Sequence, residues 1–109
     1  SERLAGATSP RLVCCTSDYL AIGALRALHE HGLRVPADVA VTGFGRTIYA
    51  SASSPSLTTV ALDSGDLGRL AGESMVRLVN GDSLPDVEHV GHRVVAGGSC
   101  PVREGAWQR

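Results

Sequence analysis

The sequence predicts an α/β fold in which a mainly parallel sheet is flanked by helices. Short apolar runs alternate along the chain with longer segments whose apolar residues recur at helical spacing. Such an alternation of strands and helices is typical of α/β proteins. With 109 residues, of which 43% are hydrophobic and 19% charged, the chain has the size of one globular domain.

The first two elements are a strand and a helix. Residues 11–15 form a short apolar run that suits a buried strand. Asp18, or Ser17 before it, is expected to cap a helix over residues 18–31, where a carboxylate also interacts favourably with the helix dipole. Gly32 should end this helix in a Schellman-type stop, with the next residue folding back onto the last turn.

A second strand and a short helix follow. Residues 39–43 are an unbroken apolar run of the kind found in parallel strands. Residues 43–45 (Gly-Phe-Gly) then lie at the carboxyl end of this strand, where open α/β sheets bind their ligands. A short helix is expected over residues 46–53, and the Ser-Pro-Ser sequence at 54–56 should end it.

The second half of the chain repeats the pattern. Residues 57–62 predict a third strand, and residues 63–66 (Asp-Ser-Gly-Asp) predict the start of a helix that reaches residue 80. Residues 87–96 predict a last strand, and the tail from Ser99 is expected to be poorly ordered. The apolar stripe of the long helix consists of Leu67, Leu70, Ala71, Met75, Leu78 and Val79.

The composition argues against several classes of protein. The formal net charge is −1 and the ten basic residues, all arginine, are scattered, so a nucleic-acid-binding surface is not expected. No apolar run is long enough to span a bilayer. The three cysteines are odd in number and two are adjacent, so no disulfide framework is expected, and a reducing cytoplasm is the simplest compartment.

No motif predicts catalysis, a metal site or a cofactor. Residues 43–45 could suggest a dinucleotide-binding loop, but the third glycine is missing at the required spacing. Cys14 and Cys15 would point to opposite faces of a strand, and the four histidines form no ligand cluster. The serines between residues 51 and 56 lack a G-x-S-x-G elbow, so an enzyme is not expected.

Two blocks of residues occur in an order and spacing that match a known family. The first block is Asp18, Gly23, Ala24, Leu25, Gly32, Leu33, Arg34, Val35, Pro36, Asp38, Val39, Gly43 and Phe44. The second block is Pro55, Leu57, Thr58, Thr59, Val60, Leu67 and Gly68. Over roughly residues 13–95 the chain therefore resembles the effector-binding domain of the lactose-repressor/galactose-repressor family of bacterial transcription regulators.

The resemblance implies part of a two-lobed, periplasmic-binding-protein-like fold. Residues 1–59 would belong to the C-terminal lobe, and residues 60–96 would supply a crossover strand, a helix of the N-terminal lobe and a returning strand. Residues 97–109 would be the C-terminal tail. Because residues 1–5 look like the end of an interrupted helix, we expect a C-terminal fragment that lacks the family's DNA-binding domain.

The implied function is ligand sensing and dimerisation in a transcription regulator, most simply a repressor. Contact with operator DNA would come only through the missing N-terminal domain. An exported solute-binding protein with the same fold is the alternative, and a remnant of an α/β enzyme is a third possibility.

The resemblance also implies positions for ligand and dimer contacts. Ser17 and Gly45 stand where the family has an Asn and an Asp that hydrogen-bond a small effector. Arg46 is then a possible substitute of opposite charge, and the effector is either a sugar or an anion. Cys14 and Thr16 are expected to line the same site. The implied homodimer contacts, for which core packing is the alternative role, are Ile22, Leu25, Ile48 and Ser53.

Overall fold

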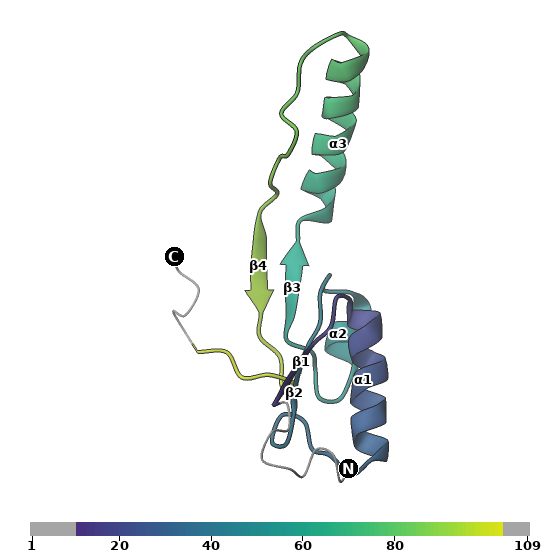
Figure 1. Ribbon diagram of the computed structural model, residues 1–109, viewed down its shortest axis with the longest axis vertical. Coiled ribbons are helices and arrows are strands. Elements are labelled where there is room, and N and C mark those ends of the chain that lie inside the picture. Colours follow the sequence, from purple (N-terminus) through teal and green to yellow (C-terminus); the bar gives the residue numbers. More distant parts are fainter. Residues whose placement is uncertain (1–10, 104–109) are drawn as a thin grey trace. The chain divides into compact units, whose positions relative to one another are not determined.

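The computed structural model describes residues 11–103 of the chain (Figure 1). The residues form two compact units, one made of the chain up to Ala61 together with the chain from Val94, and the other made of Leu62–Arg93. The helix end expected over residues 1–5, and the end of the tail with Trp107, lie outside the described residues. The elements in order are β1 (Leu12–Cys14), α1 (Asp18–Glu30), β2 (Ala40–Thr42), α2 (Ile48–Ala52), β3 (Thr59–Leu62), α3 (Ser64–Val79) and β4 (His92–Val95).

The strands form two small sheets. β1 and β2 are parallel, as predicted, and their register pairs Cys14 with Thr42. The expected burial of the first strand is wrong, because Leu12 and Cys14 are exposed. Thr58, just before β3, adds a parallel bridge to Thr42. β3 and β4 form a second two-stranded sheet, and Figure 1 draws their arrows in opposite directions. β4 covers only four of the ten residues predicted over 87–96, so the last strand is much shorter than the sequence suggested.

Helix α1 runs over Asp18–Glu30, within one residue of the predicted range 18–31 at each end. Ser17, not Asp18, is the N-cap, because its Oγ accepts a hydrogen bond from a first-turn backbone N–H at 3.2 Å. Asp18 is instead the first helical residue and is fully buried. At the other end Gly32 has a φ of +74°, and the N–H of Leu33 donates to the carbonyl of Leu28 at 2.9 Å. These two features confirm the Schellman-type stop.

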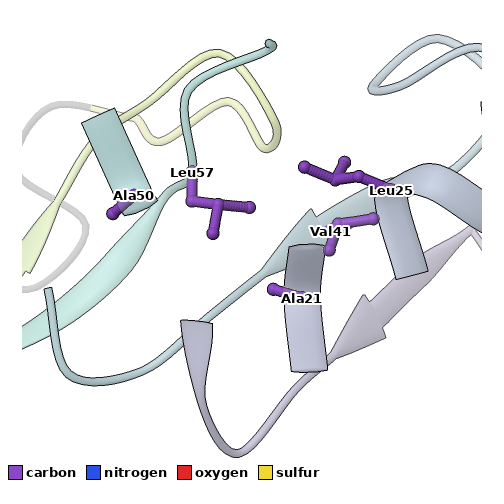
Figure 2. Packing of buried hydrophobic residues seen from close by; sticks show 5 residues of the cluster. All are labelled: Ala21, Leu25, Val41, Ala50 and Leu57. Atoms are coloured by element: carbon purple, nitrogen blue, oxygen red, sulfur yellow. The ribbon is translucent and has the colours of Figure 1, made fainter. Parts of the chain in front are cut away.

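The core of the first unit lies between α1, α2 and β2 (Figure 2). Ala21 and Leu25 of α1 pack against Val41 of β2, and Ala50 of α2 and Leu57 complete the cluster. Burying a valine or leucine side chain contributes about 1.5–3 kcal/mol, so Leu25, Val41 and Leu57 contribute more than the two alanines of this cluster. With a relative exposure of 8%, Leu25 is a core residue, which is the alternative role that the sequence left open for it.

The segment after β4 belongs to the core of the first unit, whereas the sequence suggested a poorly ordered tail from Ser99. Ser99 is fully buried. Its Oγ donates a hydrogen bond to the carbonyl of Val41 at 2.5 Å and accepts one from the N–H of Thr58 at 2.9 Å. Gly97 lies so close to Leu57 that an added Cβ would be 2.5 Å from the carbonyl of Leu57. The segment that follows β4 therefore connects β2 to the start of β3 through hydrogen bonds.

The second unit consists mainly of α3. Asp63 caps this helix, and its Oδ1 accepts a hydrogen bond from the N–H of Asp66 at 2.9 Å, which confirms the predicted helix start. Arg69 pairs with Asp66 and Glu73 on the helix surface, and hydrogen bonds to these carboxylates hold the pKa of its guanidinium above the usual range. No helix within residues 11–103 is both long and apolar enough to cross a membrane.

Candidate functional site

Two loops meet at the carboxyl end of the β1–β2 pair, and we call them the paired loops (residues 15–17 and 43–47). The N–H of Cys15 donates to the last carbonyl of β2 at 2.9 Å. The N–H of Asp18 donates to the carbonyl of Phe44 at 3.0 Å. The paired loops are therefore adjacent at the sheet edge where open α/β proteins bind ligands.

Asp18 is the polar centre of this region. Its Oδ1 accepts a hydrogen bond from Oγ1 of Thr59 at 2.7 Å, and its Oδ2 accepts one from the N–H of Thr47 at 2.6 Å. Thr47 precedes α2 and Thr59 begins β3, so one carboxylate connects three elements. A buried charge is tolerated when strong hydrogen bonds replace its hydration, as they do here. Asp18 thus fixes the second of the paired loops against α1 and β3.

Three residues shape the second of the paired loops: Gly43 by its lack of a side chain, and Gly45 and Arg46 by their positive φ. Gly43 packs directly on Asp18, because an added Cβ would collide with Oδ1 and lie 3.3 Å from Cα of Asp18. Gly45 has a φ of +115° and Arg46 has a φ of +51°. Positive φ is readily adopted by glycine but uncommon for arginine. The loop therefore makes a sharp turn just before α2.

The five residues expected to bind an effector lie on or next to the paired loops. Cys14, Thr16, Gly45 and Arg46 are exposed and Ser17 is half-buried. Although Ser17 Oγ accepts a hydrogen bond as the N-cap, its hydroxyl can still donate to a ligand. Both the polar groups and the backbone of this edge are thus accessible to a small molecule.

Cys15 was not among the expected ligand residues, and it lies against the core cluster. It is half-buried, and burial raises the pKa of its thiol, with the neighbouring Cys14 adding to the effect. A raised pKa leaves less of the nucleophilic thiolate at neutral pH. Cys15 packs against the core cluster, whereas Cys14 is exposed, so only one of the adjacent cysteines serves core packing.

Arg46 also faces a second region, a cavity of about 350 Å³. Its wall is built from α2, from Leu57 and Thr59, and from Val95 and Ala96 at the end of β4. The other four expected ligand residues are not part of this lining. Arg46 and Thr47 therefore belong to the second of the paired loops and also line this cavity.

The residues expected at a dimer interface lie around a shallow groove between α1 and α2. Ile22 and Ser53 line this groove together with Tyr49, and Leu25 forms part of its floor. Ile48 lies on α2 with a relative exposure of 78%. Ser53 is partly engaged within the chain, because its Oγ donates to the carbonyl of Pro55 at 2.9 Å.

Several residues of this region were not found from the sequence. Thr59 and Thr47 are the hydrogen-bond donors to Asp18, yet they lie 41 and 29 residues away from it. Thr59 belongs to the second matched block, which was the only available signal, and nothing local connects it with Asp18. Within the described part of the chain, no group of three or more His, Cys, Asp or Glu side chains is arranged to hold a metal ion.

Comparisons with known proteins agree with the fold. The periplasmic binding protein-like domain family matches residues 1–100. The HTH-type transcriptional regulator RegA of Clostridium saccharobutylicum is 37% identical over 78 residues, which are 72% of this chain and 24% of RegA. The HTH-type transcriptional regulator GalR of Streptococcus thermophilus is 42% identical over 71 residues, which are 65% of this chain and 22% of GalR.

A solved structure gives the same result at the level of the fold. The crystal structure of the Lac repressor dimer bound to operator and the anti-inducer ONPF is 31% identical and superimposes with a TM-score of 0.76. The match covers 83% of this chain and 32% of that chain. The chain thus spans about a quarter of the length of the curated relatives it matches.

Proposed function

Because the chain belongs to the periplasmic-binding-protein-like, effector-binding domains of LacI-type transcription regulators, we propose that it is the ligand-sensing and dimerisation part of such a regulator. The relatives are named as regulators rather than as transport proteins or enzymes, so a solute-binding role is not favoured. The proposed role is non-catalytic. The proposed regulator acts in the cytoplasm, where bacterial operator DNA is found.

The observation that carries this proposal is the meeting of the paired loops at the carboxyl end of two parallel strands. Ser17 offers a hydroxyl there, and the strand end places backbone groups beside it. The Lac repressor structure was solved with the anti-inducer ONPF, which supports a small organic effector for this chain as well. We propose a hydroxylated molecule such as a sugar, which Ser17 and backbone groups can hydrogen-bond.

The proposed switch is a shift between two conformations. An effector that binds one conformation better changes the population of both, and operator affinity changes with it through a DNA-binding domain elsewhere in the protein. Asp18 supports such coupling, because it connects the paired loops to β3, the strand that leads out of the first unit.

The proposed dimer surface is the exposed face of α1 and α2. The rings of Tyr19 and Tyr49 pack at a centroid distance of 5.2 Å, and their relative exposures are 64% and 44%. Ile48 extends this surface. Exposed aromatic and aliphatic side chains grouped on one face are typical of protein interfaces.

The effector proposal is tested by titrating the full-length protein with a panel of sugars, using calorimetry for binding and fluorescence anisotropy for operator affinity. We expect one sugar to bind saturably and to change operator affinity at least fivefold. Ser17→Asn should alter the affinity for that sugar by an order of magnitude, because the amide replaces the hydroxyl at the ligand while still capping α1.

The matched control is Asp63→Asn, the same type of exchange at the N-cap of α3, which lies in no proposed site. This control should leave sugar affinity unchanged. The assignment of Ser17 to a sugar site would be overturned if the wild-type protein bound no sugar of the panel. It would also be overturned if the two substitutions changed sugar affinity equally.

A further inference from the structure

Helix α2 lacks the N-cap hydrogen bond that the other two described helices have. Ser17 Oγ and Asp63 Oδ1 each accept a hydrogen bond from the third N–H of their helix, at 3.2 and 2.9 Å. Thr47 is the N-cap of α2, yet its side chain makes no such bond. Threonine is a good N-cap residue, so α2 has a suitable side chain in a position where the bond is not formed.

The hydroxyl of Thr47 is buried and has no partner. Its Oγ1 is the one buried side-chain polar atom in the described part of the chain without a hydrogen bond. Buried polar groups are nearly always paired, so this exception requires an explanation. The N–H of Tyr49, in the first turn of α2, makes no hydrogen bond within residues 11–103 either. A different rotamer of Thr47 would pair the two groups as an ordinary N-cap.

The position of Thr47 connects two proposed functional surfaces. Its backbone N–H donates to Oδ2 of Asp18 at 2.6 Å, which holds the second of the paired loops. Arg46, just before it, has a φ of +51°, a conformation that is unfavourable for a residue with a side chain. Ile48 and Tyr49, just after it, lie on the proposed dimer surface. Two adjacent residues of this turn thus carry unfavourable features, which a second conformation can relieve.

We propose that Thr47 is a two-position switch between the paired loops and the dimer surface. In the described position its Oγ1 is unpaired, and in the second position it accepts the N–H of Tyr49 and completes the N-cap of α2. The first turn of α2 then moves and carries Ile48 with it. The proposal rests on the proposed function for its ligand, since an effector that binds the two positions unequally changes their populations.

Nuclear magnetic resonance of the full-length protein without sugar tests the two positions. Relaxation dispersion of the δ1 methyl group of Ile48 reports exchange on the microsecond-to-millisecond timescale. We expect exchange with a minor population of roughly 1–10%. A single conformation at Ile48, with no exchange contribution to relaxation, would overturn the switch.

Three substitutions test the role of the hydroxyl. Thr47→Val should abolish the exchange at Ile48, and it should leave the melting temperature unchanged or raise it, because the lost hydroxyl has no partner in the described position. Thr47→Ser keeps a hydroxyl that caps at least as well, so the exchange should remain. The matched control is Thr42→Val, at a half-buried threonine of β2, and it should also keep the exchange.

Two outcomes of these substitutions would contradict the proposal. Exchange that persists in Thr47→Val would show that the motion does not involve the hydroxyl. A lower melting temperature of Thr47→Val would show that the hydroxyl is permanently paired, as in a purely structural role.

Addition of D-galactose, D-ribose or lactose tests the control by an effector. A sugar that binds should change the ratio of the two populations at least fivefold in the wild-type protein. Thr47→Val should still bind this sugar, but its operator affinity should change less than twofold. Sugar binding without a change of the ratio would overturn the link between the paired loops and α2. Persistent exchange at Ile48 with no sugar bound would support the switch and reject only the proposed effector.

Discussion

At the scale of single residues, the close contact between Gly43 and Asp18 organises the candidate site. Asp18 can reach Thr47 and Thr59 only because Gly43 has no side chain in the intervening space. Gly43 and Asp18 both belong to the matched sequence block, but the sequence does not show why the two residues lie close together. They lie close together because the buried carboxylate of Asp18 requires hydrogen bonds from two donors in distant parts of the chain.

We expect Gly43→Ala to lower the free energy of unfolding by about 1–3 kcal/mol, the usual cost of inserting an extra methyl group into a packed interior. The measurement is urea unfolding followed by circular dichroism. The control is Gly23→Ala in the middle of α1, where no atom lies within 4 Å of the added Cβ. This control should be neutral or stabilise the protein by up to about 1 kcal/mol. Equal stability of both variants would remove the role of Gly43.

The backbone conformation of Gly45 restricts which residue can occupy this position. The sequence suggested that an aspartate is replaced here by glycine, with a loss of the effector-binding carboxylate. Because Gly45 has a φ of +115°, an aspartate cannot take its place without strain or a change of the backbone. The loss of the carboxylate and the conformation of the turn are therefore linked, and the adjacent Arg46 shares the positive φ.

At the scale of elements, local signals determined the ends of the helices. Ser17 and Asp63 accept first-turn hydrogen bonds as N-caps. Gly32 ends α1 with the hydrogen bonds of a Schellman motif, and Gly81 follows α3 with a φ of +84°. Each of these features depends on residues within a few positions of the helix end, so sequence patterns were sufficient to find them.

We expect Gly32→Val to destabilise the protein by about 1 kcal/mol or more, because a β-branched residue disfavours the φ of +74° that the stop requires. Thermal unfolding measured by calorimetry gives the difference. Gly91→Val is the matched control, since nothing lies within 4 Å of an added Cβ and no positive φ is required there. An unchanged melting temperature in Gly32→Val would contradict the Schellman assignment.

At the scale of the whole molecule, the exposed face of α1 and α2 is the surface proposed to contact a second copy of the chain. Ile48 has 78% relative exposure, and the Tyr19–Tyr49 pair lies on the same two helices. None of these side chains belongs to the core cluster. A role in self-association accounts for their exposure better than a role in folding.

We expect Ile48→Glu to shift the full-length protein from dimer to monomer, because it would bury an uncompensated charge in each half of a symmetric interface. Sedimentation equilibrium at micromolar concentration measures the change, and a tenfold or larger increase in the dissociation constant is expected. Val87→Glu, at a residue with 66% exposure in the second unit, is the control and should leave the equilibrium unchanged. A stable Ile48→Glu dimer would exclude this surface.

The sequence by itself determined the class of fold, the order of the elements, the helix ends and the family resemblance. All of these depend on short-range periodicity, caps and turns, which a linear pattern contains. Only the tertiary structure decided the roles of Asp18, Thr59 and Ser99. Their hydrogen bonds span 29 to 58 residues, and each is fixed by burial, since a polar group removed from water must find a partner within the fold.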